Sequence, residues 1–399
     1  MPDIGIIGGG VGGTHLGLFL LKHGVSATIY TAKTPAEHLA ARLTNVVCRS
    51  GTTRARERAL GVDFWDAAAP DLEQFVVTIN GPRPLMFSGA LNPTTHVADM
   101  RIYWARLLEE FAHRGGSLVF RMLDAGGVEE LSTRHDLVVV ASGRGALSNL
   151  FPRLLEHSPF QSPQRLVLAA LFRGIAYPKP LAFQAIVNRG HGEILDFPLF
   201  SFEPGLTALG MEAAPGGAFG VLSRFHRSRF DEQRAEFEAT VLALLRDYAP
   251  SVYARIDTKR FAVARPLDIG YAAITPIVRR GYARLSNGRT VLALGDVHIT
   301  MANRQVISAH TDSSRSAISS ASLIPFRPGQ SPLSAHRLAP PLRCRKRRLI
   351  RASRRSWPRK RSLIFGPWPG NVRRSFSHLT SLTARSSLPS KRATSISTR

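Results

Sequence analysis

A glycine-rich turn directly after the first apolar segment constrains the fold of this chain most. Residues 3–7 are a short, β-branched apolar run, which is the pattern of a buried parallel strand. The next six residues fit the spacing G-x-G-x-x-G through Gly8, Gly10 and Gly13. In dinucleotide-binding folds one such glycine makes a tight turn, one lets backbone amides approach a pyrophosphate, and one lets a helix pack on the strand.

The residues around the turn supply the context that this motif needs. Residues 14–23 are expected to form a helix, Gly24 suits its C-terminal cap, and residues 25–30 form a second strand. The first amides of that helix would hold a phosphate. A glycine-rich turn without a ligand is the alternative. Thr31 stands where a ribose-binding acid is expected, which argues against a plain NAD-dependent dehydrogenase.

Two further buried strands end in small residues. Residues 136–143 end in Ser-Gly, and residues 290–296 end in Gly-Asp. A carboxylate at such a strand end can accept hydrogen bonds from a cofactor hydroxyl, although either segment alone could be an ordinary strand before a turn. Together with the glycine turn they follow the order of FAD-dependent aromatic hydroxylases, so we expect an α/β fold with a Rossmann-like FAD-binding domain and a β-sheet substrate domain.

More segments carry a specific resemblance. They are residues 5–20, Arg42-Leu43-Thr44-Asn45-Val46, Asp99-Met100-Arg101-Ile102-Tyr103, residues 158–160, 163–165 and 190–193, and Gly295-Asp296-Val297. Over about residues 4–301 the chain resembles the oxygenase component of two-component, FAD-dependent styrene/indole monooxygenases. The resemblance implies that reduced FAD arrives from a separate NADH-dependent flavin reductase and reacts with O₂. One oxygen atom then passes to a small aromatic alkene to give an epoxide.

The resemblance also implies roles for individual residues. The implied cofactor-binding residues are Gly8, Gly10 and Gly13 under the pyrophosphate, Arg42 at the phosphate or ribityl oxygens, Arg101 from its helix, and Asp296 at the ribityl–pyrophosphate region. Asn45 is implied to lie near the isoalloxazine, at the oxygen-transfer site. Without the resemblance, Arg42 would be a solvated arginine and Asn45 a turn residue. The flavin supplies the chemistry, so no catalytic triad or metal cluster is expected.

The expected domain order follows from these segments. Residues 1–164 and 283–301 form the FAD-binding domain, and residues 165–282 form the substrate domain. Strand-like runs and a helical segment at residues 231–248 recur in the substrate domain, where Phe and Leu are frequent. Such a composition suits a pocket for an apolar aromatic substrate, although any single residue of this kind could simply belong to the core.

Residues 302–399 form a separate, basic region. The whole chain has 53 Lys and Arg against 28 Asp and Glu, but residues 301–399 hold 21 basic residues and only one acid, Asp312. The family's glycine-rich loop after Gly295-Asp296 is missing here. We therefore expect a frameshift near codon 302, a disordered tail, and a flavin site that lacks one wall and is impaired. A genuine nucleic-acid-binding arm, with Trp357 and Trp368 available to stack on bases, is the alternative.

The remaining composition excludes several classes of protein. Two cysteines cannot supply a multi-disulfide framework or a cysteine-rich zinc site. No run of 18 apolar residues and no basic N-terminal leader occurs, so a cytoplasmic protein without a membrane role is expected. Two other functions stay open at this stage. One is an FAD- or NAD-binding oxidoreductase of another reaction class, and the other is a nucleotide-binding protein with a nucleic-acid-binding tail.

Overall fold

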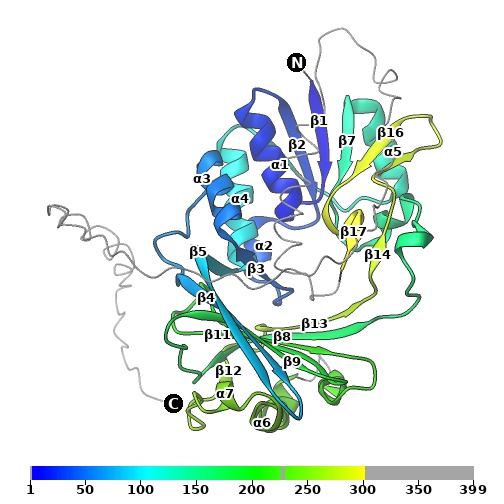
Figure 1. Cartoon of the computed structure of the whole chain (residues 1–399). Helices are drawn as coiled ribbons and strands as arrows, with labels where there is room; N and C mark the ends of the chain where they lie inside the picture. The colour runs from blue at the N-terminus through cyan, green and yellow to red at the C-terminus, as the bar shows by residue number, and fades with distance from the viewer. Residues whose placement is uncertain (1, 226–229, 302–399) are drawn as a thin grey trace, which may run out of the picture. The chain divides into compact units, whose positions relative to one another are not determined.

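The computed structural model describes residues 2–225 and 230–301. The predictions made for residues 302–399 fall outside these residues. Figure 1 shows two layered units, one built on a parallel sheet with helices on both faces and one built on a larger, mostly antiparallel sheet. The predicted α/β architecture, a Rossmann-like domain together with a second domain built on a β-sheet, is confirmed.

The first unit contains a six-stranded sheet in the order β15-β16-β7-β1-β2-β6. Its strands are β1 (Asp3–Ile7), β2 (Ser26–Thr31), β6 (Ser117–Phe120), β7 (Leu137–Val140), β15 (Tyr282–Arg284) and β16 (Thr290–Ala293). All pairs are parallel except β15–β16. Both faces of such a sheet must be covered, which explains the unbroken apolar sequence of β1 and β7.

Helices cover the two faces of this sheet. They are α1 (Val11–Lys22), α2 (Pro35–Leu39), α3 (Gly51–Leu60), α4 (Met100–His113) and α5 (Ala125–Arg134). Ile6 of β1 packs in one buried cluster with Leu18 of α1 and Phe111 of α4. Its neighbour Ile7 points the other way and packs with Leu131 of α5. Alternate residues of one strand therefore anchor helices on opposite faces.

The second unit contains a nine-stranded sheet in the order β12-β8-β11-β10-β9-β4-β5-β3, with β13 also paired to β8. Its strands are β3 (Val46–Arg49), β4 (Leu72–Asn80), β5 (Leu85–Asp99), β8 (Arg165–Arg173), β9 (Ala182–Asn188), β10 (Gly192–Pro198), β11 (Thr207–Ala213), β12 (Ala262–Val263) and β13 (Ile269–Ile274). Three of these strands, β3, β4 and β5, precede residue 165, and β4 connects them to the later strands by pairing in parallel with β9. The domain boundary at residue 164 stays a prediction.

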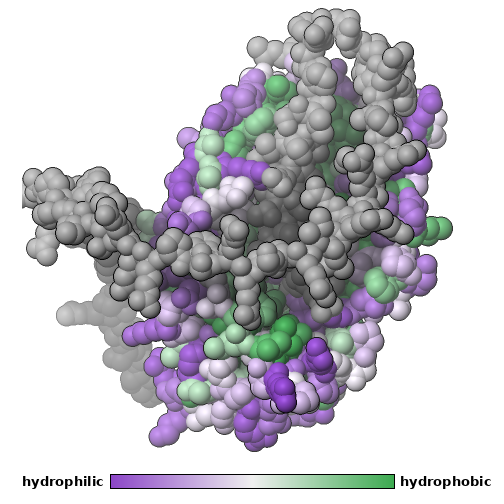
Figure 2. All heavy atoms as spheres, viewed as in Figure 1, coloured by the Kyte–Doolittle hydropathy of each residue, from purple (hydrophilic) through white to green (hydrophobic). Residues whose placement is uncertain are grey.

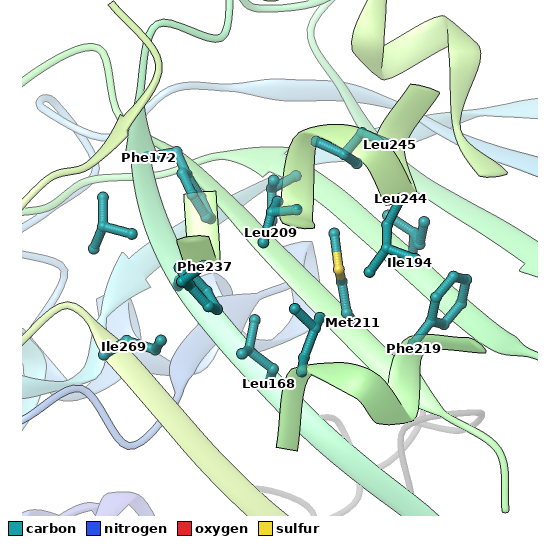
Figure 3. Close-up of a cluster of buried hydrophobic side chains, with 14 of the residues drawn as sticks. Leu168, Phe172, Ile194, Leu209, Met211, Phe219, Phe237, Leu244, Leu245 and Ile269 are labelled. Carbon is teal, nitrogen blue, oxygen red and sulfur yellow. The ribbon is translucent and has the colours of Figure 1, made fainter. Parts of the chain in front are cut away.

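The long helix α6 (Phe230–Tyr248) and the short α7 (Pro250–Tyr253) cover the outer face of this sheet. Figure 3 shows Phe237 of α6 among Leu168, Phe172 and Leu209 of the sheet, all buried in one cluster. The space-filling view in Figure 2 shows mostly hydrophilic side chains on the outside, with a smaller apolar group over the second sheet. The strands β14 (Ile277–Val278) and β17 (Ile299–Thr300) form a separate antiparallel pair.

Candidate flavin site

The glycine turn lies between the end of β1 and the start of α1. Gly8 has φ +121°, and a Cβ on it would lie 2.4 Å from the carbonyl oxygen of Ala141, after β7. A Cβ on Gly13 would lie 1.9 Å from the carbonyl oxygen of Gly8. Neither position has room for a side chain. Glycine at position 8 lets the turn pack against the end of β7, and glycine at position 13 lets α1 pack against the turn.

Gly10 differs from its neighbours, because a Cβ on it would meet no atom of residues 2–225 and 230–301 within 4 Å. It caps the N-terminus of α1 with no side-chain hydrogen bond, which leaves the first amides of the helix without a side-chain acceptor. An open space before uncapped amides and the positive end of the helix dipole suit an anion. The residues present therefore fit a pyrophosphate at Gly10.

A buried polar network fixes α1 in place behind this turn. His15 of α1 bonds to the hydroxyl of Tyr103 (Nε2–Oη 2.7 Å), and that hydroxyl donates to Glu57 Oε1 at 2.5 Å. Arg49 donates to the other oxygen of Glu57 from Nε at 2.8 Å and from Nη2 at 2.5 Å. Burial lowers the pKa of His15, which keeps its imidazole neutral. The sequence alone does not reveal this network, because its members come from four separate elements.

The segment that carries Arg42 and Asn45 runs from α2 into β3. Arg42 donates from Nη1 to the carbonyl oxygen of Pro266 at 2.9 Å. Asn45 is exposed, and its Oδ1 accepts from the backbone amide of Val46 at 2.9 Å. The amide of Leu43 donates to the carbonyl oxygen of Leu267 at 2.7 Å. The segment is thus tied by its backbone to the second unit, while Asn45 faces outward.

Arg101 lies in the interior, where protein acceptors engage its guanidinium. Its Nη2 donates to Asp99 Oδ2 at 2.5 Å and to Asp268 Oδ1 at 2.7 Å, and its Nη1 lies 3.3 Å from the carbonyl oxygen of Ala41. Burial would lower the pKa of Arg101, but the two carboxylates outweigh burial and raise it. The arginine stays charged and is 1% exposed. Its predicted contact with the cofactor stays a prediction.

Asp296 lies at the carboxyl end of β16, in the short helical turn Gly295–Val297. Its carboxylate is exposed, with Oδ2 3.8 Å from Arg144 Nε. Arg144 follows β7 and donates from Nη1 to the carbonyl oxygen of Ala273 on β13 at 3.4 Å. Strand β13 also carries Gly270, where a Cβ would lie 2.4 Å from the carbonyl oxygen of Leu43. One strand therefore touches both the Arg42–Asn45 segment and the loop that faces Asp296.

A pocket of about 410 Å³ opens beside β13. Its lining residues are Arg144, Tyr271, Ala272, Ala273, Thr275, Ile277, Arg279 and Thr300. The Nη1 of Arg279 is buried, and none of the described residues forms a hydrogen bond with it. Burial and then the nearby charge of Arg153 lower the pKa of Arg279, whereas the other arginine of this wall, Arg144, lies 3.8 Å from the carboxylate of Asp296. Arg144 and Arg279 were not singled out from the sequence, although Arg144 directly follows the predicted Ser142-Gly143 strand end.

Two features are absent from residues 2–225 and 230–301. No group of three or more His, Cys, Asp or Glu side chains is arranged to hold a metal ion. No helix within the same ranges combines the length and the apolar character needed to cross a membrane.

Known proteins resemble this chain in both sequence and fold. The family described as "Styrene monooxygenase A putative substrate binding domain" matches residues 143–255. The styrene monooxygenase StyA of a Pseudomonas species and that of Pseudomonas fluorescens are each 36% identical over 299 residues, which cover 75% of this chain and 71% of theirs.

Solved structures share the fold at low sequence identity. The flavin-dependent brominase Bmp2 matches with a TM-score of 0.59 at 14% identity, over 80% of this chain and 77% of its own. The myxobacterial chondrochloren halogenase CndH matches with a TM-score of 0.56 at 18% identity, over 80% and 73%. These structures support the fold, and the StyA relatives identify the activity. The chain belongs to the styrene monooxygenase family and is a flavin-dependent monooxygenase.

Proposed function

We propose that this protein epoxidises styrene-like aromatic alkenes, with indole as a second substrate, using reduced FAD supplied by a separate NADH-dependent reductase. FAD is the cofactor. The observation that carries the proposal is the space at Gly10 before the uncapped amides of α1, which the described residues leave open, together with a separate pocket at β13 that Arg144 helps to line. The first can hold a pyrophosphate, and the second can hold a flavin ring with an apolar substrate.

When bound, reduced FAD supplies the oxygen chemistry with O₂, and the protein's residues supply position and shielding. The amides after Gly10 bind the pyrophosphate, and Gly8 and Gly13 let the turn come close enough to do so. Arg42 binds phosphate or ribityl oxygens, with Asp296 accepting from ribityl hydroxyls. Asn45 faces outward at the next turn and orients the reacting groups, which act only within a narrow range of geometry.

The pocket at β13 supports an apolar aromatic substrate. Ala272, Ala273 and Ile277 line it, and its volume of about 410 Å³ falls within the range of small-molecule sites. The arginines on its other wall suit the polar edge of a flavin ring. Removing water from this space protects the reactive cofactor from side reactions.

The end of β2 supports a separate source of electrons. This strand ends at Thr31, which is 7% exposed, and a Cβ on the adjacent Gly9 would lie 3.0 Å from Thr31 Oγ1. A ribose-binding carboxylate would normally stand at this strand end in an NAD-binding site. The missing carboxylate argues against an NAD-dependent dehydrogenase, and we propose that FAD reduced by the separate reductase brings the electrons.

We also propose that this chain is impaired. Residues 302–399 do not continue the family's glycine-rich loop, and their composition differs from the rest of the chain. Without the residues of that loop, we expect water to reach the flavin ring. Reduced FAD and O₂ would then give H₂O₂ and oxidised FAD instead of epoxide.

The test compares two electron sources with the full chain, FAD, O₂ and styrene. NADH alone should give no epoxide, whereas photoreduced FAD or an added flavin reductase should give styrene oxide together with excess H₂O₂. Indole under the same conditions should give an oxidised product. If NADH alone is oxidised at the reductase-supported rate, the two-component proposal fails. A variant with a restored reading frame after codon 301 should give more epoxide per H₂O₂, and equal ratios would refute the impairment.

A further inference from the structure

The turn at residues 265–268 leaves the second sheet between β12 and β13. Val263 still pairs with Phe172 of β8, and pairing resumes where Ile269 meets Ala170. The carbonyl groups of Pro266 and Leu267 in this turn make no bond to β8, so groups from other parts of the chain can bond to them.

Three donors from outside the sheet meet two consecutive carbonyl groups of this turn. The amide of Leu43 donates to Leu267 O at 2.7 Å, and Arg42 Nη1 donates to Pro266 O at 2.9 Å. Arg101 Nη1 lies 3.4 Å from Leu267 O and 3.3 Å from the carbonyl oxygen of Ala41. Arg101 thus sits between the turn and the segment that begins at Ala41.

Asp268 anchors the turn. Its carboxylate is 1% exposed and accepts from Arg101 Nη2 at 2.7 Å and from Arg265 Nε and Nη2 at 3.0 and 2.9 Å. Its own carbonyl oxygen accepts from the amide of Leu171 at 3.0 Å. Charge-assisted bonds of this kind, buried and made to two arginines, hold a loop in one geometry.

The Leu43 backbone is also held from a second direction. A Cβ on Gly270 would lie 2.4 Å from Leu43 O, so β13 packs directly against that carbonyl group. With its amide bonded to Leu267 and its carbonyl pressed on Gly270, Leu43 has little freedom. Leu43 lies next to Arg42 and two residues before Asn45, so the position of both follows from this contact.

We propose that Asp268 is a positioning residue, which acts through Arg101 and the 265–268 turn to set the Arg42–Asn45 segment against the flavin. The effect of Asp268 on flavin binding rests on the proposed function of Arg42 and Asn45. The restraint of the Arg42–Asn45 segment by Asp268 in the protein without flavin does not depend on that proposal.

The test uses Asp268→Asn in the full chain, because this change keeps the shape and removes the charge. Hydrogen exchange of the peptide around residues 40–46 should become roughly tenfold faster without FAD, while exchange of β1 stays unchanged. The dissociation constant of FAD should rise by roughly threefold to tenfold.

Asp196→Asn is the matched control. Asp196 is a fully buried carboxylate paired with Arg255, and it lies in the second unit on β10. Its loss should leave exchange at residues 40–46 unchanged. Arg101→Lys is the second variant in case Asp268→Asn unfolds. A lysine keeps the charge but cannot reach Asp99, Asp268 and both carbonyl groups, so it should loosen the same peptide.

The outcomes separate the inference from the proposed function. Unchanged exchange at residues 40–46 in a folded Asp268→Asn or Arg101→Lys protein overturns the inference. Faster exchange there with unchanged FAD affinity supports the restraint but contradicts a place for Arg42 at the flavin. Faster exchange with weaker FAD binding supports both.

Discussion

Gly10 faces open space in the described part of the chain, whereas Gly13 lies against the backbone of Gly8. Alanine should therefore affect ligand binding at the first position and stability at the second. At Gly10 a methyl group meets no atom of the described part of the chain and enters the space assigned to the pyrophosphate. At Gly13 it would lie 1.9 Å from the carbonyl oxygen of Gly8, so the backbone has to move. We expect Gly10→Ala to weaken FAD binding in a stable protein, and Gly13→Ala to destabilise the protein itself.

The expected magnitudes follow from these contacts. Gly10→Ala stabilises the protein by reducing the entropy of the unfolded chain, but alanine is a poorer N-cap than glycine. Because these two effects nearly cancel, the free energy of unfolding should change by less than about 1 kcal/mol. Losing one or two amide bonds to a charged phosphate should weaken FAD binding by about 10- to 100-fold. Gly13→Ala should cost roughly 3 kcal/mol, as overpacking against backbone does.

The assay pairs thermal unfolding with FAD titration by fluorescence. Gly12→Ala is the matched control, because its Cβ would make ordinary contact with Leu294 at 3.4 Å. It should leave both stability and FAD affinity close to wild type. Unchanged FAD affinity in a folded Gly10→Ala protein would refute a pyrophosphate site at this turn.

Three further predictions concern the active segment, the buried ion pair and the core. Asn45→Ala should lower the rate of styrene epoxidation by about 10- to 100-fold while FAD affinity changes little, and equal rates would remove Asn45 from the site. Burial raises the pKa of Asp196 to about 6 although Arg255 opposes the shift. The folded protein therefore holds a proton that the unfolded chain has released, and this contribution to stability is present near pH 4 and lost as the pH rises through about 6. Urea unfolding at pH 4.5 and 7 should show a smaller difference in the free energy of unfolding for Asp196→Asn than for the wild type. An identical difference in the two proteins would contradict this prediction. Phe237→Ala should lower the free energy of unfolding by about 3–5 kcal/mol, because the ring is 0% exposed within the α6 cluster, and a loss below about 1 kcal/mol would show that the cluster closes around the gap.

Local patterns predicted much of the fold from sequence. The run before Gly8 forms β1 over Asp3–Ile7, and the helix expected at residues 14–23 forms α1 over Val11–Lys22. The helix expected at residues 231–248 forms α6 over Phe230–Tyr248. These elements depend on periodicity and on glycine at a tight turn, which neighbouring residues reveal.

Long-range partners could not be predicted in this way. Strands β4 and β5 join the second sheet because β4 pairs with β9, about a hundred residues later. Arg101 was placed at the cofactor by resemblance, but its ion pair with Asp268 spans 167 residues of sequence. No spacing rule connects such residues, so the role of Asp268 became visible only in three dimensions.

The central claim is that this chain transfers an oxygen atom from O₂ to an aromatic alkene with reduced FAD. The most direct measurement mixes the full chain with photoreduced FAD, styrene and ¹⁸O₂, and analyses the products by mass spectrometry. The account predicts styrene oxide that carries one ¹⁸O atom, in a yield below the H₂O₂ formed. Styrene left unoxidised by a protein that binds FAD, or an epoxide whose oxygen comes from water, would contradict it.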